Sequence, residues 1–196
     1  IRRRLAERAD GTLRRHPDPQ ELARRVRGRT LAGTGRQGKY LMLRLDSGDV
    51  VVVHLGMSGQ LLVAGAGEPA VKHTHVAFRF EDGRELRFVD PRTFGEVFVS
   101  APDGPHGTLP ELSHLGPDLL ASPDAEGEDR FVALLAGRPT RLKPLLMDQA
   151  RVAGIGNMYA DEILFAAGLR FDRPASSLSG DEARRLFRAA VEVLGE

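Results

Sequence analysis

The chain contains no cysteine and no long apolar run. Without cysteine, its 196 residues can form no disulfide and no zinc site with cysteine ligands, which fits a reducing compartment. No stretch approaches the roughly 18 apolar residues that a membrane-spanning helix needs. Ile1 is followed by three arginines rather than by the apolar core of a signal peptide. These absences give no support to a secreted, disulfide-stapled protein or to a membrane protein.

The length allows one large domain or two small ones. Hydrophobic residues make up 41% and charged residues 28%, as in ordinary folded proteins with a buried core. The net charge of +1 hides an asymmetry, because residues 1–36 contain 11 arginines and only four acidic residues. A basic segment of this kind suits a polyanionic partner, although a solvated arginine-rich surface fits the composition equally well.

Residues 40–100 have the pattern of a β domain. Six short segments with alternating or β-branched residues are separated by turn signals. The predicted strands are 40–45, 50–55, 60–64, 75–80, 85–89 and 96–100. Before them, a short helix is expected over 20–26 and a glycine-containing loop over 33–38. This arrangement predicts an antiparallel sandwich or barrel.

The pattern becomes helical after a segment rich in proline and glycine at 101–110. The predicted helices are 130–136, 143–149, 157–168 and 181–194. Ser179 and Glu182 have the spacing of a capping box for the last helix. We therefore predict an α+β chain in which an antiparallel β-sandwich domain, residues 1–104, precedes an all-α domain, residues 105–196.

Gly154 and Gly156 lie between two predicted helices and are followed by Asn157. Glycine permits positive φ and close approach of another group. The N-terminus of the following helix presents free N–H groups that can bind a phosphate. Asn157 is placed to cap the helix or to donate its amide N–H to a phosphate oxygen. An ordinary helix–helix turn with an asparagine cap also fits, and on these residues alone it is favoured.

Two loops at strand ends carry side chains suited to insertion into DNA. Met57 lies in a loop flanked by glycines, where a flexible apolar side chain can wedge between bases. Arg92 and Phe94 share a short connector, in which arginine can read a base edge and phenylalanine can stack. The alternatives are core positions for Met57 and Phe94 and a salt bridge between Arg92 and Asp90.

Three further residues are candidates of lower specificity. Lys39 begins a strand and by itself reads as a surface lysine. His73 and His75 have the spacing that places both on one face of a strand. Such a pair suits a metal, but no third ligand is apparent, so we expect structural or hydrogen-bonding roles for both histidines.

Each motif is weak by itself, whereas the ordered set is highly specific. From about Arg15 to the C-terminus, the chain resembles the formamidopyrimidine-DNA glycosylase family. The resemblance is carried by Gly-Lys-Tyr-Leu (38–41), His-Leu-Gly-Met-Ser-Gly (54–59), Lys-His-Thr-His-Val (72–76), Asp-Pro-Arg-Thr-Phe-Gly (90–95), Leu-Gly-Pro-Asp (115–118), Lys-Pro-Leu-Leu-Met-Asp (143–148) and Gly-Ile-Gly-Asn-Met-Tyr-Ala-Asp-Glu (154–162). The last motif resembles the family's helix–two-turn–helix element.

The resemblance implies a partner, damaged double-stranded DNA, held in a cleft between the two domains. Met57, Arg92 and Phe94 match a trio that fills the gap left when the damaged nucleotide is flipped out. In this trio, Arg92 would hydrogen-bond the orphaned cytosine and Phe94 would wedge beside it.

The remaining matches concern the DNA backbone. Lys39 matches a lysine that contacts a phosphate near the lesion and assists base excision, so it is the candidate catalytic residue. His54 matches a phosphate-contacting histidine. Asn157 matches the phosphate-binding asparagine of the two-turn element, and Gly156 is the glycine next to it.

The resemblance also implies parts that these residues do not contain. The family's nucleophile is an N-terminal proline that forms a Schiff base with the sugar, and the family ends in a four-cysteine zinc finger. We therefore expect a chain cut at both ends, no cofactor within it, and Zn²⁺ only in the intact protein. The intact protein would be a glycosylase and AP lyase for oxidised purines such as 8-oxoguanine and formamidopyrimidines. The chain alone is expected to be inactive as a lyase.

Three alternatives remain at this point. An endonuclease VIII-like enzyme would prefer oxidised pyrimidines, although such relatives usually differ at the Met-Ser-Gly and Arg-x-Phe positions. A non-catalytic module would bind damaged DNA without excising a base, and a two-domain protein without a DNA role would need the motif order to be coincidence. For the favoured function we expect a monomer in the bacterial cytoplasm, associated with the nucleoid and with no membrane partner.

Overall fold

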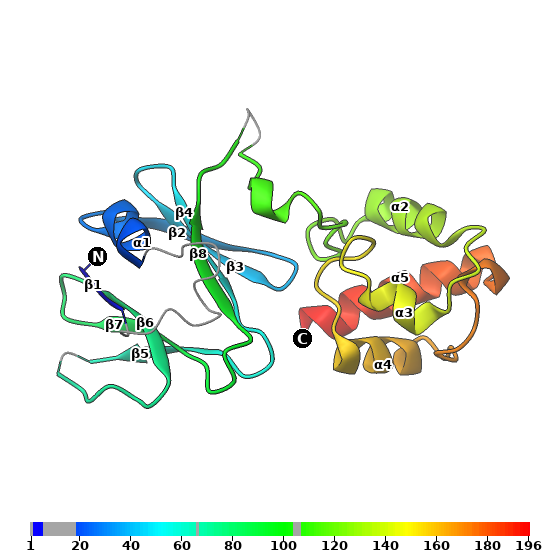
Figure 1. Cartoon of the computed structure of the whole chain (residues 1–196). Coiled ribbons are helices and arrows are strands. Elements are labelled where there is room, and N and C mark those ends of the chain that lie inside the picture. The colour runs from blue at the N-terminus through cyan, green and yellow to red at the C-terminus, as the bar shows by residue number, and fades with distance from the viewer. Residues whose placement is uncertain (1, 6–18, 66, 104–106) are drawn as a thin grey trace. The chain divides into compact units, whose positions relative to one another are not determined.

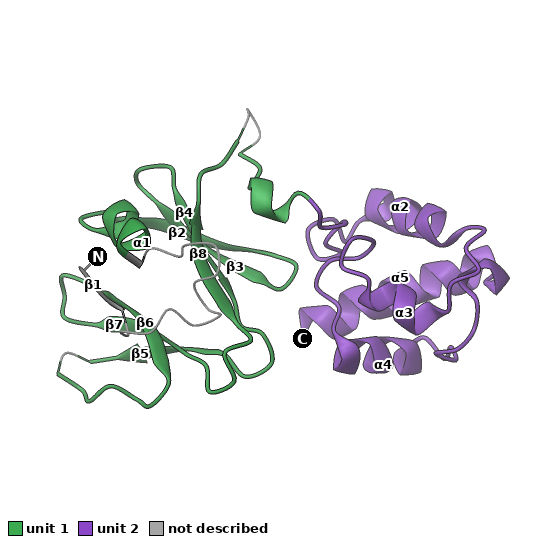
Figure 2. Cartoon of the chain, viewed as in Figure 1, with its two compact units in different colours: residues 1–113 green, residues 114–196 purple. Residues whose placement is uncertain are grey.

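The computed structural model describes residues 2–5, 19–65, 67–103 and 107–196, and divides into two units, 1–113 and 114–196 (Figures 1 and 2). The predicted boundary lay earlier, between residues 104 and 105. A short 3₁₀ helix, η2 (Pro110–Leu112), accounts for the difference, because it belongs to the first unit. The Ser100 hydroxyl donates a hydrogen bond to the Glu111 carboxylate, and Leu112 is buried.

The first unit contains two four-stranded antiparallel sheets, with strand orders β1-β6-β7-β5 and β2-β3-β4-β8. The strands are β1 (Arg2–Leu5), β2 (Leu31–Gln37), β3 (Tyr40–Leu45), β4 (Val50–His54), β5 (Gln60–Ala64), β6 (Thr74–Arg79), β7 (Glu85–Val89) and β8 (Glu96–Ser100), and helix α1 spans Pro19–Val26. The predicted antiparallel sandwich is confirmed, as are the short helix near residue 20 and all six predicted strands.

One prediction was wrong: residues 33–38 were expected to form a glycine-containing loop, but strand β2 occupies most of this segment. It pairs with β3 along its length, from Leu31 opposite Leu45 to Gln37 opposite Tyr40. Tertiary pairing outweighs the low strand propensity of glycine here. Strand β1 was also missed in the arginine-rich N-terminal segment, where its backbone pairs with β6.

The core of the first unit lies between the sheets, as strand alternation requires. Every second residue of β4 and β8 points inward, and α1 adds Leu22 and Val26 at one side. The buried cluster contains Leu22, Val26, Leu45, Val51, Val53, Val76, Phe78, Phe88, Val97 and Val99. Val52 and Phe98, on the opposite face of the same strands, are also fully buried. The centre of the second sheet is therefore buried on both faces.

The second unit is entirely helical. It contains α2 (Ala125–Leu135), α3 (Leu142–Met147), α4 (Asn157–Ala166), the 3₁₀ helix η3 (Ala175–Ser177) and α5 (Gly180–Gly195). All four predicted α-helices are confirmed, but α2 begins earlier than predicted, since the Asp124 carboxylate accepts the Gly127 N–H at 3.0 Å and caps it. The capping box of Ser179 and Glu182 is confirmed. In the described part of the chain, no helix is long and apolar enough to cross a membrane.

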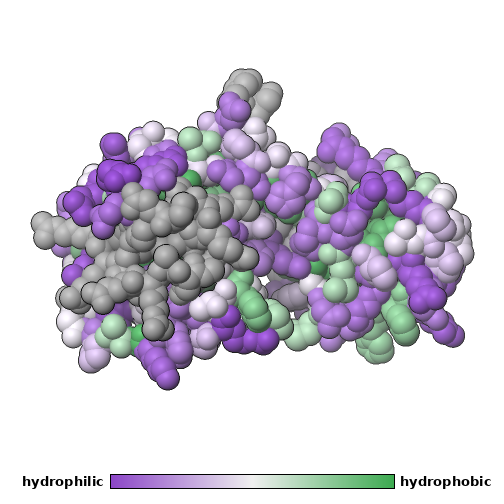
Figure 3. Space-filling view, in the orientation of Figure 1, coloured by the Kyte–Doolittle hydropathy of each residue, from purple (hydrophilic) through white to green (hydrophobic). Residues whose placement is uncertain are grey.

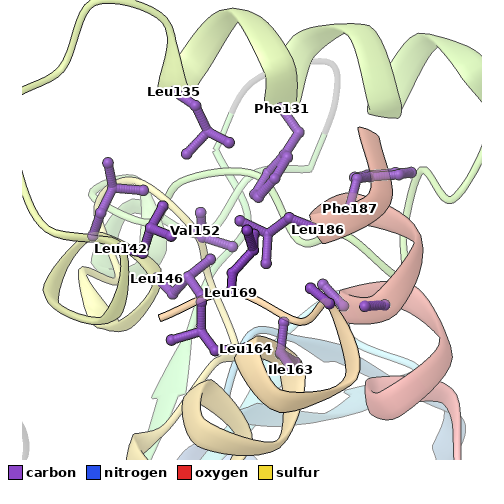
Figure 4. Packing of buried hydrophobic residues seen from close by; sticks show 14 of the residues in the cluster. Phe131, Leu135, Leu142, Leu146, Val152, Ile163, Leu164, Leu169, Leu186 and Phe187 are labelled. Carbon is purple, nitrogen blue, oxygen red and sulfur yellow. The ribbon is translucent and has the colours of Figure 1, made fainter. Parts of the chain in front are cut away.

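Side chains from all four α-helices meet in one core (Figure 4). Phe131 of α2 and Phe187 of α5 pack with ring centroids 5.7 Å apart. Leu142 and Leu146 of α3 and Ile163 and Leu164 of α4 belong to the same buried cluster. This core fixes the orientation of α3 and α4, and therefore the geometry of the turn between them.

Candidate nucleic-acid interface

Lys39, Tyr40 and His54 lie together at one end of the sheet β2-β3-β4-β8. The hairpin of β2 and β3 turns through two residues, and Gly38 has the positive φ of 56° that its first position requires. Tyr40 faces His54 across the strand pair, with ring centroids 4.8 Å apart, and His54 in turn faces Glu96. The hairpin therefore brings Lys39 next to His54.

The electrostatics of this group favour a neutral histidine and a lysine of reduced basicity. Burial lowers the pKa of His54, the Lys39 charge lowers it further, and Glu96 opposes these effects. Partial burial of its amine lowers the pKa of Lys39, although the residue as a whole is exposed. The His54 Nδ1 accepts the Gly56 N–H at 3.1 Å. The neutral ring therefore carries its proton on Nε2, where it is a hydrogen-bond donor.

Two loops follow the same sheet end and contact each other through their backbones. The first, residues 55–59, carries Met57, and the second, residues 90–95, carries Arg92 and Phe94. A Cβ atom on Gly56 would lie only 2.6 Å from the carbonyl carbon of Phe94. The loops are therefore in close van der Waals contact at a position where only glycine fits.

Asp90 joins the two loops by hydrogen bonds. Its side chain is fully buried. One carboxylate oxygen accepts the Ser58 hydroxyl at 2.5 Å and the Arg92 N–H at 3.2 Å, and the other accepts the Gly95 N–H at 2.7 Å. Burial raises the pKa of Asp90, but these three hydrogen bonds together lower it below its usual value. The buried carboxylate is therefore ionised at neutral pH.

Met57, Arg92 and Phe94 point away from the core. Met57 is 74% exposed and Phe94 is 50% exposed. In Figure 3, where the residues outside the described part are grey, most of the coloured surface is hydrophilic. The Arg92 guanidinium carbon lies 4.9 Å from the centre of the Phe94 ring. This geometry rules out core positions for Met57 and Phe94, and Arg92 stacks on Phe94 rather than forming a salt bridge with Asp90.

The two histidines of the 72–76 motif have different structural settings. His75 Nε2 lies 2.8 Å from the Asp90 carbonyl oxygen, which confirms the expected hydrogen-bonding role. His73 precedes β6 and has a φ of 66°, so it does not continue the strand as its spacing suggested. Among the residues that the structure describes, no group of three or more histidine or acidic side chains could hold a metal ion.

The turn between α3 and α4 presents the first turn of α4 to solvent. Gly154 has a φ of 102°, Ile155 is fully buried, and Gly156 is the N-cap residue of α4. Asn157 is the first helical residue and is exposed. Among the described residues no side chain caps this helix, so of the two roles left open for Asn157 the capping role is excluded: Asn157 lies one residue after the N-cap. Within the described part of the chain, the first-turn N–H groups and the Asn157 amide therefore have no side-chain partner and can bind an anion.

Gln149 holds this turn in shape. Its amide nitrogen donates to the carbonyl oxygens of Met147 and Ile155, both at 2.8 Å, and its amide oxygen accepts the Gly154 N–H at 3.0 Å. The turn also rests on Gly116, where a Cβ would lie 2.5 Å from the backbone of Arg151. These contacts fix the backbone directly before the N-terminus of α4.

Comparisons with known proteins match both units. Residues 3–97 match the model of the formamidopyrimidine-DNA glycosylase N-terminal domain, and residues 115–196 match the model of that enzyme's H2TH domain. Over 99% of the chain, the sequence is 47% identical to the formamidopyrimidine-DNA glycosylase of Salinispora arenicola. The chain belongs to the formamidopyrimidine-DNA glycosylase family.

Other members of this family are similar at lower coverage. The glycosylase of Moorella thermoacetica is 45% identical over 91% of the chain. The Lactococcus lactis enzyme, solved with DNA containing an abasic site and with DNA containing FAPY-dG, has a TM-score of 0.77 and 28% identity over 90% of the chain. The chain spans about two thirds of its relatives: 68% of the Salinispora protein, 64% of the Moorella protein and 64% of the first Lactococcus structure.

The structure brings five of the seven predicted site residues of this family member together in the first unit: Lys39, His54, Met57, Arg92 and Phe94. The other two, Gly156 and Asn157, form the turn of the second unit. Ser58 and Gln149 were not predicted from the sequence, and Asp90 was predicted only as a possible partner of the Arg92 side chain. The only sequence signal for these three residues was a polar side chain close to a glycine-containing loop, because their hydrogen-bond partners are brought near them only by the fold.

The close approach at Gly56 leads to a stability prediction. Gly56→Ala places a methyl group against backbone atoms and strains a φ of 62°. We expect the free energy of unfolding to fall by at least about 2 kcal/mol, measured by urea denaturation. Gly33→Ala is the control, since that glycine has no atom within 4 Å and no positive φ. Equal midpoints for the two variants would contradict the packing described for the loops.

Proposed function

We propose that this protein binds double-stranded DNA at a damaged or missing base, and that the full-length protein excises oxidised purines such as 8-oxoguanine and formamidopyrimidines in base excision repair. One observation supports this most strongly. The loops joined by Asp90 display Met57, Arg92 and Phe94 beside Lys39 and His54, in a family whose Lactococcus member was solved with abasic and FAPY-dG DNA. The relatives above carry the glycosylase name, so an endonuclease VIII-like activity is not favoured.

The exposed trio suits the gap that a flipped nucleotide leaves in the duplex. Flipping costs a few kcal/mol in lost stacking and pairing, and side chains that enter the gap recover part of this cost. Arg92 would donate paired hydrogen bonds to the orphaned cytosine. Phe94 and Met57 would fill the remaining space as apolar wedges. The stacking of Arg92 on Phe94 limits the orientations of both side chains before DNA arrives.

The remaining groups suit the DNA backbone. His54 offers an Nε2–H donor, and Lys39 offers a cation beside it. In the second unit, Asn157 and the free N–H groups of α4 would hold another phosphate. Because these contacts replace counterions, affinity is expected to fall steeply as the salt concentration rises.

We propose that the full-length protein is also an AP lyase, which requires an amine that forms an imine with the sugar. In the family this amine belongs to an N-terminal proline, and Lys39 assists excision. Residue 1 of the sequence is isoleucine. We propose that a polypeptide of residues 1–196 binds lesion DNA but forms little imine, because Ile1 does not offer the secondary amine of the N-terminal proline that the family uses.

Borohydride trapping tests the prediction about the imine. Borohydride reduces the imine between protein and abasic sugar to a stable covalent adduct. We expect little or no adduct from residues 1–196 and a high yield from the Lactococcus enzyme as the positive control. An adduct of comparable yield from residues 1–196 would contradict this prediction. If the full-length protein also gave no covalent adduct, the non-catalytic DNA-binding alternative would be correct.

Zinc does not fit the residues present, since the chain has no cysteine and its described residues contain no cluster of metal ligands. We propose that any zinc of the full-length protein is bound outside these 196 residues and that this part needs no cofactor. We further propose that the protein acts as a monomer on DNA in the bacterial cytoplasm, at the nucleoid.

A further inference from the structure

Asp90 connects three segments of the first unit: the 55–59 loop, the 90–95 loop and the start of β6. Its carboxylate binds Ser58 of the 55–59 loop and two N–H groups of the 90–95 loop. Its backbone N–H donates to the His73 carbonyl oxygen at 3.0 Å, and its own carbonyl oxygen contacts His75. The Asp90 backbone is therefore fixed by the start of β6, and its side chain can transmit this position to both loops.

The 90–95 loop needs such support because its backbone is strained. Thr93 has a φ of 55°, which is unfavourable for a β-branched residue. The two N–H groups that Asp90 accepts, from Arg92 and Gly95, lie on either side of Thr93. The carboxylate thus spans the strained residue and holds the part of the loop that carries Arg92 and Phe94.

Ser58 is the only residue of the 55–59 loop whose side chain is seen to donate to Asp90 among the described contacts. It lies next to Met57 and is half-buried. Without its hydroxyl, the 2.5 Å hydrogen bond between the loops is lost, and one oxygen of Asp90 keeps only the longer contact with the Arg92 N–H. This hydrogen bond therefore links the Met57 loop to the Arg92–Phe94 loop in addition to their backbone contact at Gly56.

We propose that the Ser58–Asp90 hydrogen bond couples the two loops, so that Met57, Arg92 and Phe94 enter the DNA gap as one preformed unit. The inference rests on the proposed function and deepens it. Ser58 and Asp90 are positioning residues, since they act through the trio. Without the hydrogen bond, only the backbone contact at Gly56 would join the loops, so their side chains would order more independently on DNA and the affinity for a gapped duplex would fall.

The first test uses the free protein and amide hydrogen exchange. Ser58→Ala should accelerate exchange of the Gly95 amide, in the other loop, by about tenfold, because opening of the Asp90 network becomes easier. The Val53 amide in the centre of β4 should be unchanged. Ser58→Thr keeps the hydroxyl and should restore slow exchange of the Gly95 amide. Ser47→Ala, in the turn between β3 and β4, is the control. Unchanged Gly95 exchange in Ser58→Ala would overturn the inference.

The second test uses binding to a duplex with a tetrahydrofuran abasic analogue. Met57→Ala and Phe94→Ala are measured singly and together, with Ser58 intact and with Ser58→Ala. With Ser58 intact, the loss of affinity in the double variant should differ by about fivefold from the product of the losses in the two single variants. With Ser58→Ala, the effects should multiply. Multiplicative effects with Ser58 intact would overturn the coupling and leave the proposed function standing. A failure to prefer abasic DNA would overturn the proposed function, and the exchange measurement would still decide the coupling.

Discussion

Asn157→Asp should leave the fold at least as stable as the wild type and weaken binding to abasic DNA by about 100-fold. The two side chains have nearly the same shape. An acidic group in the first turn of α4, which has none, interacts favourably with the helix dipole and should add about 0.3–1 kcal/mol to stability. The same charge repels a phosphate and removes the amide donor. Urea denaturation and fluorescence anisotropy measure the two effects.

The control for Asn157→Asp adds a negative charge elsewhere in the second unit. Ala133→Glu is suitable because Ala133 is exposed on α2, and α2 and α4 each pack against α5 (Figure 1). We expect this variant to lose less than threefold in affinity, since distant surface charges are screened by salt. Equal losses for the two variants would mean that net charge, and not a phosphate contact at Asn157, determines the effect.

Arg92→Ala should lower affinity for an abasic site opposite cytosine by roughly 10- to 100-fold, the range expected for loss of a paired hydrogen bond to a base. Opposite adenine the loss should be smaller, so the preference for cytosine should largely disappear. Part of the loss comes from Phe94, which no longer has the guanidinium over its ring. Affinities are measured for four duplexes: an abasic site opposite cytosine, an abasic site opposite adenine, and the two corresponding undamaged duplexes. The comparison separates the loss of the base contact from the loss due to Phe94.

Arg84→Ala is the matched control for Arg92→Ala. Arg84 is an exposed arginine of the same unit, in the turn between β6 and β7, where its guanidinium is paired with Asp82. Its removal should change affinity by less than threefold and leave the opposite-base preference unaltered. An Arg92→Ala loss that is the same opposite cytosine and opposite adenine would show that Arg92 contacts the backbone rather than the base.

The strands were predictable where alternating apolar residues dominate the sequence pattern. Strands β3, β5, β7 and β8 have their predicted bounds, because alternating apolar residues face the core between clear turn signals. Strand β2 was not predictable, since Gly33 and Gly35 have low strand propensity and form a strand only through pairing with β3. Local pattern therefore decided these four strands, two of which (β5 and β8) are edge strands, whereas tertiary pairing decided β2.

The candidate site divides in a similar way. The exposed residues could be proposed from motif order, because Met57, Arg92 and Phe94 stand in short loops between recognisable strands. The residues that hold them could not, since Ser58 and Asp90 lie 32 positions apart and meet only in the folded sandwich. Gln149 likewise gains its role from three backbone contacts around Gly154 that exist only once α3 and α4 are packed.

The most direct test of the proposed function is the affinity of residues 1–196 for a tetrahydrofuran-containing duplex and for the same duplex without the lesion, measured at several salt concentrations. We expect at least a tenfold preference for the lesion. Affinity for both duplexes should decrease with salt, since phosphate contacts are common to both, while the preference should persist. Equal affinity for the two duplexes, or no binding to either, would contradict the assignment of these loops and this turn to a damaged-DNA interface.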